Sequence, residues 1–259
     1  MILPDWPAPA NVHACCTTRV GGRSQAPYDS LNLGDHVGDA AQDVVSNRLA
    51  FATALGARPV FLAQVHGTHA IELTAATADG RQADGCATAQ RGLACTIMAA
   101  DCLPVLLCDS GGRAVAAAHA GWRGLAGRSV GGNGNGILEA TLTQFRALAG
   151  IERQQVADRT IAWLGPCIGP DAFEVGAEVK AAFDVHDPQS TACFRPHANG
   201  KWLADLQGLA RLRLHMLGVM RIYGNDGSAQ WCTLHNPSQF FSHRRDRVSG
   251  RFAASVWLD

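Results

Sequence analysis

Three short segments of the chain contain side chains that can bind a metal or attack a substrate. QVHG contains His66, AADCLPVLLCD contains Cys102, and AAAHAGWRG contains His119. Two imidazoles and one thiolate suit zinc, and three protein ligands leave the fourth coordination position open for water or substrate. Because an open position distinguishes a catalytic zinc site from a structural one, these residues predict a metalloenzyme.

The same residues also permit chemistry without a metal. Cys102 as nucleophile and His119 as its base would make an enzyme of the amidase type. Both interpretations require a thiolate near an imidazole, so the sequence leaves the role of Cys102 open. The neighbouring Asp101 either orients a metal ligand by hydrogen-bonding it, without touching the metal, or caps a turn. His69, close to His66 in QVHGTH, is expected to be an ordinary exposed or hydrogen-bonded histidine.

The composition excludes several classes of protein. The 259 residues include 22 basic and 22 acidic side chains, so no net charge steers the chain toward nucleic acid or an anionic membrane. Nine cysteines without a CxxC pair argue against a disulfide framework and a zinc finger. No segment is long and apolar enough for a membrane span, and the N-terminus lacks the pattern of a signal peptide. We therefore expect a cytoplasmic protein, monomeric or weakly dimeric, that binds small molecules and neither nucleic acid nor membrane.

Apolar runs alternate with amphipathic ones along the chain. Continuous apolar runs are typical of strands covered on both faces, and apolar residues near the helical period predict helices. The expected strands are 12–18, 59–66, 94–100, 104–109, 113–120, 160–165, 220–224 and 254–259, and the expected helices are 41–55, 136–149, 174–184 and 204–218. The DSGG turn predicts an antiparallel hairpin, and Gly218 is a candidate helix C-cap. This mixture predicts an α/β or α+β fold with mixed sheets, in a single domain spanning 1–259.

A glycine-rich segment, GGNGNG at 131–136, invites comparison with phosphate-binding loops. Such loops follow a strand and are accompanied by a lysine and a hydroxyl residue, or by an acidic residue further along the chain. None of these features accompanies the segment, so we interpret it as a surface insertion.

Six motifs, taken in order, resemble the laccase-domain family. They are LNLGDHVGD (31–39), QVHG, ADCLPVLLCD, HAGWRG, GPCIGPDAFEV (165–175), and FFSHRRD followed by GRFAA (240–254). Members of this family were first described as polyphenol oxidases and later recognised as purine nucleoside phosphorylases. The bacterial peptidoglycan editing factors belong to the same family. The resemblance extends from TTRVGG near the N-terminus to Ala254.

The resemblance implies a domain with α/β/β/α layers and a zinc held by His66, Cys102 and His119, which would also be the catalytic residues. It implies phosphorolysis of adenosine, inosine or methylthioadenosine to the free base and a ribose 1-phosphate. Adenosine deamination is also associated with the family. Copper (Cu²⁺) is a further candidate metal in vitro, because it outcompetes zinc (Zn²⁺) at many sites with nitrogen and sulfur ligands.

The chain departs from the family pattern in two places. RSVGGNGN near 128–135 stands where the family runs more directly into a helix, and we expect it to change only a surface loop. His243 stands where a tyrosine is common, and this difference is expected to affect substrate preference.

Phosphorolysis needs groups that bind a phosphate dianion and stabilise the departing base. The planar donors of arginine match the geometry of phosphate. The candidate arginines are Arg19, Arg123, Arg244, Arg245 and Arg251. Arg244 is preferred because its motif matches the family, and Arg19 and Asn32 complete the predicted substrate-binding set. Asn32 is expected to hydrogen-bond the ribose or base, or to hold a turn.

We therefore expect a zinc-containing purine nucleoside phosphorylase, with adenosine deamination as a second reaction to be tested. The alternative is a cysteine-nucleophile enzyme that uses Cys102 and His119 on cell-wall precursors. A copper-dependent polyphenol oxidase is disfavoured, because the chain has no H-x-H pair of the kind that trinuclear copper sites use. A non-catalytic binding module would leave three reactive residues without a role.

Overall fold

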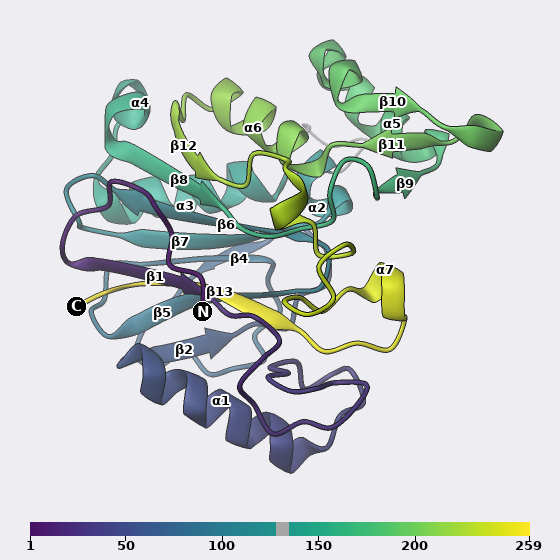
Figure 1. Cartoon of the computed structure of the whole chain (residues 1–259). Coiled ribbons are helices and arrows are strands. Elements are labelled where there is room, and N and C mark those ends of the chain that lie inside the picture. The colour runs from purple at the N-terminus through teal and green to yellow at the C-terminus, as the bar shows by residue number, and fades with distance from the viewer. Residues whose placement is uncertain (128–134) are drawn as a thin grey trace.

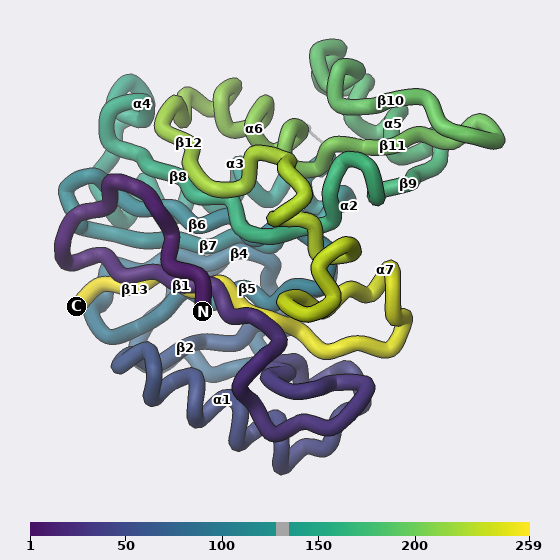
Figure 2. The backbone as a smooth tube through the Cα atoms, in the orientation of Figure 1, coloured from purple at the N-terminus to yellow at the C-terminus, as the bar shows by residue number. Residues whose placement is uncertain are grey.

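A computed structural model describes residues 1–127 and 135–259, and Figures 1 and 2 show the path of the chain. The predicted surface insertion at 128–135 and the glycine-rich segment at 131–136 lie, except for their last residues, outside the described residues.

Two mixed sheets form the centre of the molecule (Figure 1). The first has the order β1-β13-β5-β2, with antiparallel pairs except for the parallel pair of β2 and β5. The second has the order β12-β8-β6-β7-β4-β3, with parallel pairs at both edges and antiparallel pairs between them. The strands of these sheets are β1 (Val12–Cys16), β2 (Arg58–Phe61), β3 (Ala70–Glu72), β4 (Gly85–Thr88), β5 (Leu93–Ala99), β6 (Leu103–Asp109), β7 (Val115–Ala120), β8 (Thr160–Leu164), β12 (Arg221–Gly224) and β13 (Phe252–Leu258).

A smaller antiparallel sheet of order β10-β11-β9 projects beside the second sheet (Figure 1). Its strands are β9 (Glu174–Val175), β10 (Phe194–Pro196) and β11 (Trp202–Ala204). The α-helices are α1 (Ala41–Leu55), α2 (Trp122–Ala126), α3 (Ile137–Ala149), α4 (Val156–Arg159), α5 (Ala177–Asp184), α6 (Leu206–Met216) and α7 (His243–Asp246). Short 3-10 helices cover Arg153–Gln155, Pro188–Cys193, Ala198–Gly200 and Ala229–Trp231. None of the helices in the described residues is both long and apolar enough to cross a membrane.

Strand β6 shows why the molecule is layered. Successive side chains of a strand point to opposite faces, and in β6 both faces are apolar. Leu103 and Val105 belong to the core that packs under α3 and α6, whereas Leu106 belongs to the core between the two large sheets. Burial of one such side chain contributes roughly 1.5–3 kcal/mol to folding. A strand that is apolar on both faces therefore has to lie between two layers.

Helix α1 covers the outer face of the first sheet. Its Phe51 packs with Phe61 of β2 and Met98 of β5 in a separate core cluster. The layers are therefore helix, sheet, sheet and helix, which confirms the predicted α/β/β/α arrangement with mixed sheets (Figure 1).

Each predicted strand and helix has a counterpart in the structure. The DSGG turn joins β6 and β7 as an antiparallel hairpin with Gly112 at φ +67°, and Gly218 follows α6 at φ +85°. The expected helix at 174–184 begins only at Ala177, because Glu174 and Val175 pair with β11. Strands β3, β4, β9, β10 and β11 were not expected, and nor were α4 and α7.

Candidate functional site

His66 lies in the turn that follows β2. Just before it, Gln64 pairs with both backbone groups of Met98, since Nε2 donates to the carbonyl and Oε1 accepts from the amide, each at 2.8 Å. Beyond Phe61, the Gln64 side chain takes the place of the β2 backbone as the hydrogen-bond partner of β5. The strand therefore ends at Phe61, earlier than the expected range of 59–66. His66 then adopts φ +58°, a left-handed conformation uncommon for residues other than glycine. Such a conformation persists only where the surroundings hold it in place.

Cys102 lies in the connection from β5 of the first sheet to β6 of the second. The preceding Asp101 has φ +95°, and its carboxylate accepts hydrogen bonds from the Thr233 hydroxyl (2.6 Å) and the Arg244 amide (2.7 Å). The Asp101 carbonyl accepts the amide of Ile168 (2.9 Å). Asp101 therefore joins three loops around Cys102. It also accepts a hydrogen bond from an N-terminal amide of α7, so of the two roles expected for Asp101 it has the capping role.

His119 is placed by the alternation of β7. Val115 and Ala117 belong to the core between the two large sheets, and His119 continues the same series toward the end of the strand. Its side chain is consequently buried on the face of the second sheet that meets the first. There Nδ1 lies 2.9 Å from a carboxylate oxygen of Asp84.

Asp84 holds two of the three predicted ligands, although the sequence did not single it out. Its fully buried carboxylate accepts the amides of Val65 (3.2 Å), His66 (2.9 Å) and Gly67 (2.7 Å) as well as Nδ1 of His119. These bonds hold the unusual turn at His66 and fix the orientation of the His119 ring. An acidic residue alone in a buried run of small residues, ADGCAT, was the available signal.

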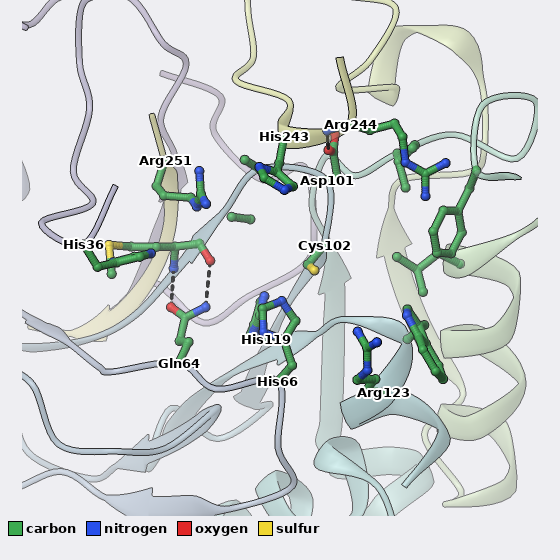
Figure 3. Close-up of a pocket in the computed structure, with 17 residues that line it drawn as sticks. His36, Gln64, His66, Asp101, Cys102, His119, Arg123, His243, Arg244 and Arg251 are labelled. Atoms are coloured by element: carbon green, nitrogen blue, oxygen red, sulfur yellow. Dashed lines mark hydrogen bonds between the residues drawn. The ribbon is translucent and has the colours of Figure 1, made fainter. Parts of the chain in front are cut away.

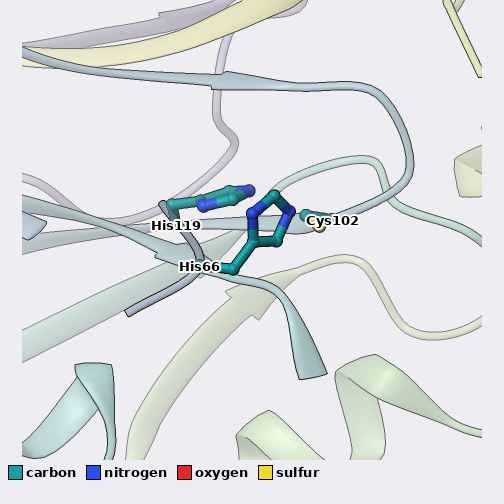
Figure 4. Close-up of side chains that lie close together, drawn as sticks. All are labelled: His66, Cys102 and His119. Atoms are coloured by element: carbon teal, nitrogen blue, oxygen red, sulfur yellow. The ribbon is translucent and has the colours of Figure 1, made fainter. Parts of the chain in front are cut away.

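The side chains of His66, Cys102 and His119 converge, as Figure 4 shows. One ligand atom from each lies within 4.8 Å of the others, and the two imidazole rings are 4.8 Å apart in an edge-on arrangement. Burial opposes ionisation of Cys102, but His119 and His66 outweigh it and lower its pKa to about 6. Burial disfavours the charged form of His119, but the Cys102 thiolate and Asp84 raise its pKa to about 9.

These three residues fit a divalent metal by the chemistry of their donors. Because Nδ1 of His119 donates to Asp84, Nε2 is the ring nitrogen available to a metal, an arrangement common around histidine ligands. Gly121 leaves the room that the cluster needs, since a Cβ there would lie 2.9 Å from the Cys102 Sγ and 3.0 Å from His66 Cδ2. Within residues 1–127 and 135–259, no other group of three or more histidine, cysteine or carboxylate side chains lies close enough together to hold an ion.

The cluster lies in a cavity of about 400 Å³ (Figure 3). On one side of the cluster are Arg123 and Arg244, and on the other are His36 and Arg251. The remaining walls mix apolar and polar groups. They are Gln64, Met98, Ala99, Ala100, Asp101, Trp122, Ile168, Phe173, Leu206 and His243.

The predicted arginines are used in different ways. Arg244 lines the cavity, with its guanidinium 5.5 Å from the Phe173 ring and Nη1 donating to the Glu174 carbonyl (3.0 Å). Arg245 is outside the cavity lining and donates to the carbonyls of Thr233, Leu234 and Phe240, which makes it structural.

The structure places two predicted substrate-binding residues away from the cavity. Arg19 is bound to the side chain and carbonyl of Asp29 and to the carbonyl of Pro237, so its donors hold a loop. Asn32 is fully buried. Its side-chain Nδ2 donates hydrogen bonds to the Gly34 carbonyl and the Asp39 carboxylate, and its Oδ1 accepts the backbone amides of Gly34 and Arg251. Asn32 therefore holds a turn, and reaches the cavity only through Arg251.

Two further histidines were considered in the sequence. His69 faces the carbonyl of Gln82 at 3.2 Å, is exposed, and is not part of the metal-ligand cluster. His243 lines the cavity, so the position where the family commonly has a tyrosine is one that a bound substrate can contact.

A family model described as multi-copper polyphenol oxidoreductase laccase matches residues 13–259. Among curated proteins, one from Pseudomonas aeruginosa named purine nucleoside phosphorylase is 47% identical over 99% of this chain and 98% of its own. The Escherichia coli protein YfiH, with the same name, is 45% identical over 100% of this chain and 98% of its own.

Solved structures show the same likeness. A Neisseria meningitidis protein superimposes with a TM-score of 0.89 at 43% identity, covering 100% of this chain and 98% of that one. The protein YlmD from Geobacillus stearothermophilus gives 0.83 at 32% identity, covering 96% and 92%. With one family model matching nearly the whole length and relatives aligned from end to end, this chain belongs to the laccase-like family of polyphenol oxidoreductase domains, as the sequence motifs predicted.

Proposed function

We propose that this protein is a zinc-dependent purine nucleoside phosphorylase that acts on adenosine, inosine or methylthioadenosine. The observation that carries the proposal is the convergence of His66, Cys102 and His119 in a cavity with aromatic and cationic walls. A volume of about 400 Å³ falls within the range of small-molecule sites. The relatives named purine nucleoside phosphorylase, aligned over nearly the whole chain, support the choice of substrate.

The aromatic side of the cavity suits the purine base. Trp122 and Phe173 offer flat apolar surfaces, and the guanidinium groups of Arg123 and Arg244 lie 4.5 Å and 5.5 Å from these rings. Stacking against aromatic rings and cations favours a flat, electron-rich heterocycle.

In phosphorolysis an oxygen of the phosphate dianion forms a bond to C1′ of the ribose as the bond from C1′ to the base nitrogen breaks. The bonding electron pair leaves with the base, which then takes a proton from water, and the products are free base and ribose 1-phosphate. The chain contributes by orienting both reactants and by placing cations near the developing negative charges.

His66, Cys102 and His119 would hold the zinc, and Asp84 would orient the His119 ring through the hydrogen bond to Nδ1. A zinc bound there supplies a Lewis acid beside the reacting groups. In other enzymes such a metal also activates a bound water, which is the nucleophile that adenosine deamination would need. The experiment described below tests for deamination as well.

A second candidate rests on the contact between Asp84 and His119. Cys102, His119 and Asp84 form a series of nucleophile, base and orienting carboxylate, the logic of a catalytic triad, and the pKa of Cys102 is lowered to about 6. A cysteine enzyme of the amidase type acting on cell-wall precursors would use these groups. His66 favours the metal enzyme, because a triad does not need a third donor held in a left-handed turn.

The test is release of base from adenosine and inosine by protein of measured metal content, with and without phosphate. Base and ribose 1-phosphate formed only with phosphate, at about one zinc per chain, would support the phosphorylase. Conversion of adenosine to inosine would show deamination. Turnover of neither nucleoside would favour the cysteine enzyme.

Variants separate the two roles of Cys102. Cys102→Ala is expected to lose both bound metal and at least about 100-fold in kcat/KM. Cys193→Ala, a change at a half-buried cysteine outside the cavity, is the matched control. Loss of activity in Cys102→Ala with full metal content would identify a nucleophile and overturn the ligand assignment.

A further inference from the structure

Arg251 occupies the side of the cavity opposite Arg123 and Arg244. Figure 3 shows Arg251 and His36 on one side of His119, and the other two arginines on the far side. Arg251 stands immediately before β13, so its backbone is anchored in the first sheet.

The backbone and the side chain of Arg251 are both held by neighbouring groups. The Arg251 amide donates to Asn32 Oδ1 (2.8 Å), and Nη1 donates to the carbonyls of Ser249 (2.8 Å) and Gly250 (3.0 Å). Gly34 packs against its aliphatic carbons, since a Cβ at Gly34 would lie 2.8 Å from Arg251 Cγ. The guanidinium is therefore held in one orientation before any substrate arrives.

The charge of Arg251 is not balanced by a carboxylate. In the part of the chain that the structure describes, it forms no ion pair, and Nε and Nη2 have no hydrogen-bond partner. Both Asp101 oxygens already accept hydrogen bonds from Thr233 and Arg244. Burial lowers the pKa of Arg251, partly offset by the negative charges of Cys102 and Asp101. A half-buried cation that has no carboxylate partner gains by binding an anion.

The other two arginines are less suited to an anion. Arg123 is exposed and stacked on Trp122 at 4.5 Å, and the Arg244 guanidinium lies over the Phe173 ring at 5.5 Å. Both lie on the aromatic side, where the base is proposed to bind.

We propose that Arg251, flanked by His36 and His243, is the subsite for the phosphate that attacks C1′. This inference rests on the proposed phosphorylase function. Phosphate must approach the ribose from the face opposite the departing base, and the cavity places Arg251 on the side opposite the aromatic walls. The arginine preferred from the sequence, Arg244, is thereby assigned to the nucleoside.

Steady-state kinetics with phosphate and inosine varied separately test this assignment. Arg251→Gln is expected to raise the KM for phosphate about tenfold or more while the KM for inosine changes less than about twofold. Arg244→Gln is expected to show the reverse pattern. Arg247→Gln makes the same change at an exposed residue of the same loop, outside the cavity, and is expected to match the unmodified protein. Arg251→Lys keeps the charge but loses the planar fork, and is expected to recover only part of the phosphate affinity.

Binding of inorganic phosphate, measured by calorimetry on the metal-loaded protein, gives a readout that does not depend on turnover. Weaker phosphate binding in Arg251→Gln than in Arg247→Gln supports the subsite even if no nucleoside is cleaved, in which case only the proposed reaction fails. Unchanged phosphate binding and KM in Arg251→Gln and Arg251→Lys overturn the subsite. Equal increases in both KM values also overturn it, because they indicate a general loss of shape.

Discussion

The carboxylate of Asp84 connects backbone conformation to chemistry at the level of a single residue. Burial opposes its ionisation, but His119 and the amides of Gly67 and Val65 hold its pKa below the ordinary value. It accepts four hydrogen bonds, three of them from consecutive amides of the turn that contains His66. One charged group therefore stabilises both the strained turn and the orientation of the neighbouring imidazole.

Asp84→Asn tests this role. The amide keeps the shape but replaces one acceptor oxygen with a donor, so the turn and the His119 ring lose part of their support. We expect metal affinity to fall by about 10–100-fold, measured by competition with a chelator. Asp158→Asn, at an exposed carboxylate of α4, is the control. Equal affinities in the two variants would remove Asp84 from the account of the metal site.

The lowered pKa of Cys102 predicts a pH profile for the metal-free protein. A thiol reacts as its thiolate, so alkylation of Cys102 should be half-maximal near pH 6 and slow as the pH falls further, with labelling followed by mass spectrometry. Buried cysteines such as Cys15 and Cys108, whose pKa is raised to about 12, should remain unlabelled across this range. His119→Asn should move the Cys102 profile to higher pH, and an unchanged profile would mean that His119 does not stabilise the thiolate.

Single residues were predictable where their type is rare and reactive. His66, Cys102 and His119 stand in short distinctive motifs, and the structure brings them together. Arg19 was predicted from its type alone, and its partner Asp29 could not be inferred because the pairing depends on how two loops fold. Asp84 was missed for the same reason, since its hydrogen-bond partners come from a turn and a strand distant in sequence.

Among the elements, the short helix α2 packs directly against the site. Gly121 is its N-cap, with extended backbone at φ −69° and ψ 157°, so another residue can adopt its conformation. What requires glycine there is space, because a Cβ would contact Cys102 and His66.

Gly121→Ala is therefore expected to displace the ligands while leaving the fold intact. Metal content should fall well below that of the unmodified protein, whereas the thermal midpoint of the metal-free form should change by about 4 °C or less. Gly176→Ala, at the N-cap of α5, is the matched control, because a Cβ there meets only the flexible end of Glu178. Full metal loading of Gly121→Ala would show that the cluster tolerates a wider spacing.

Long apolar or amphipathic elements were predictable, and short ones were not. Strands β6 and β7 are continuous apolar runs, and helix α1 has apolar residues near the helical period, so all three were recognisable in the sequence. Strand β4 consists of GCAT, two of whose residue types, glycine and alanine, are depleted in strands, and it is a strand because β7 and β3 pair with it. Tertiary contacts of this kind cannot be inferred from local sequence.

For the whole molecule, the site lies where the two large sheets meet. His66 follows β2 of the first sheet, His119 belongs to β7 of the second, and Cys102 lies in the connection between the sheets. A metal held by all three would join the two layers at one edge.

Removal of the metal should consequently lower the stability of the entire chain. At free zinc about 100 times its Kd, binding adds about 2.7 kcal/mol to the free energy of unfolding, which corresponds to roughly 5–10 °C in the thermal midpoint. Calorimetry with and without a chelator measures this difference. Cys102→Ser should unfold at the same temperature in both conditions, and a chelator effect that survives in this variant would place the metal elsewhere.

The hydrogen bonds of Asp84 have a consequence for how the proposed site would acquire a metal. They hold the turn at His66 and the ring of His119 through contacts within the protein, so the binding geometry exists before any ion enters. A preorganised site with two nitrogen ligands and one sulfur ligand discriminates weakly among late transition metals. On the proposed assignment, the ion found in purified protein would depend on the metals available during expression. Metal exchange after purification would then be the way to restore the ion that supports turnover.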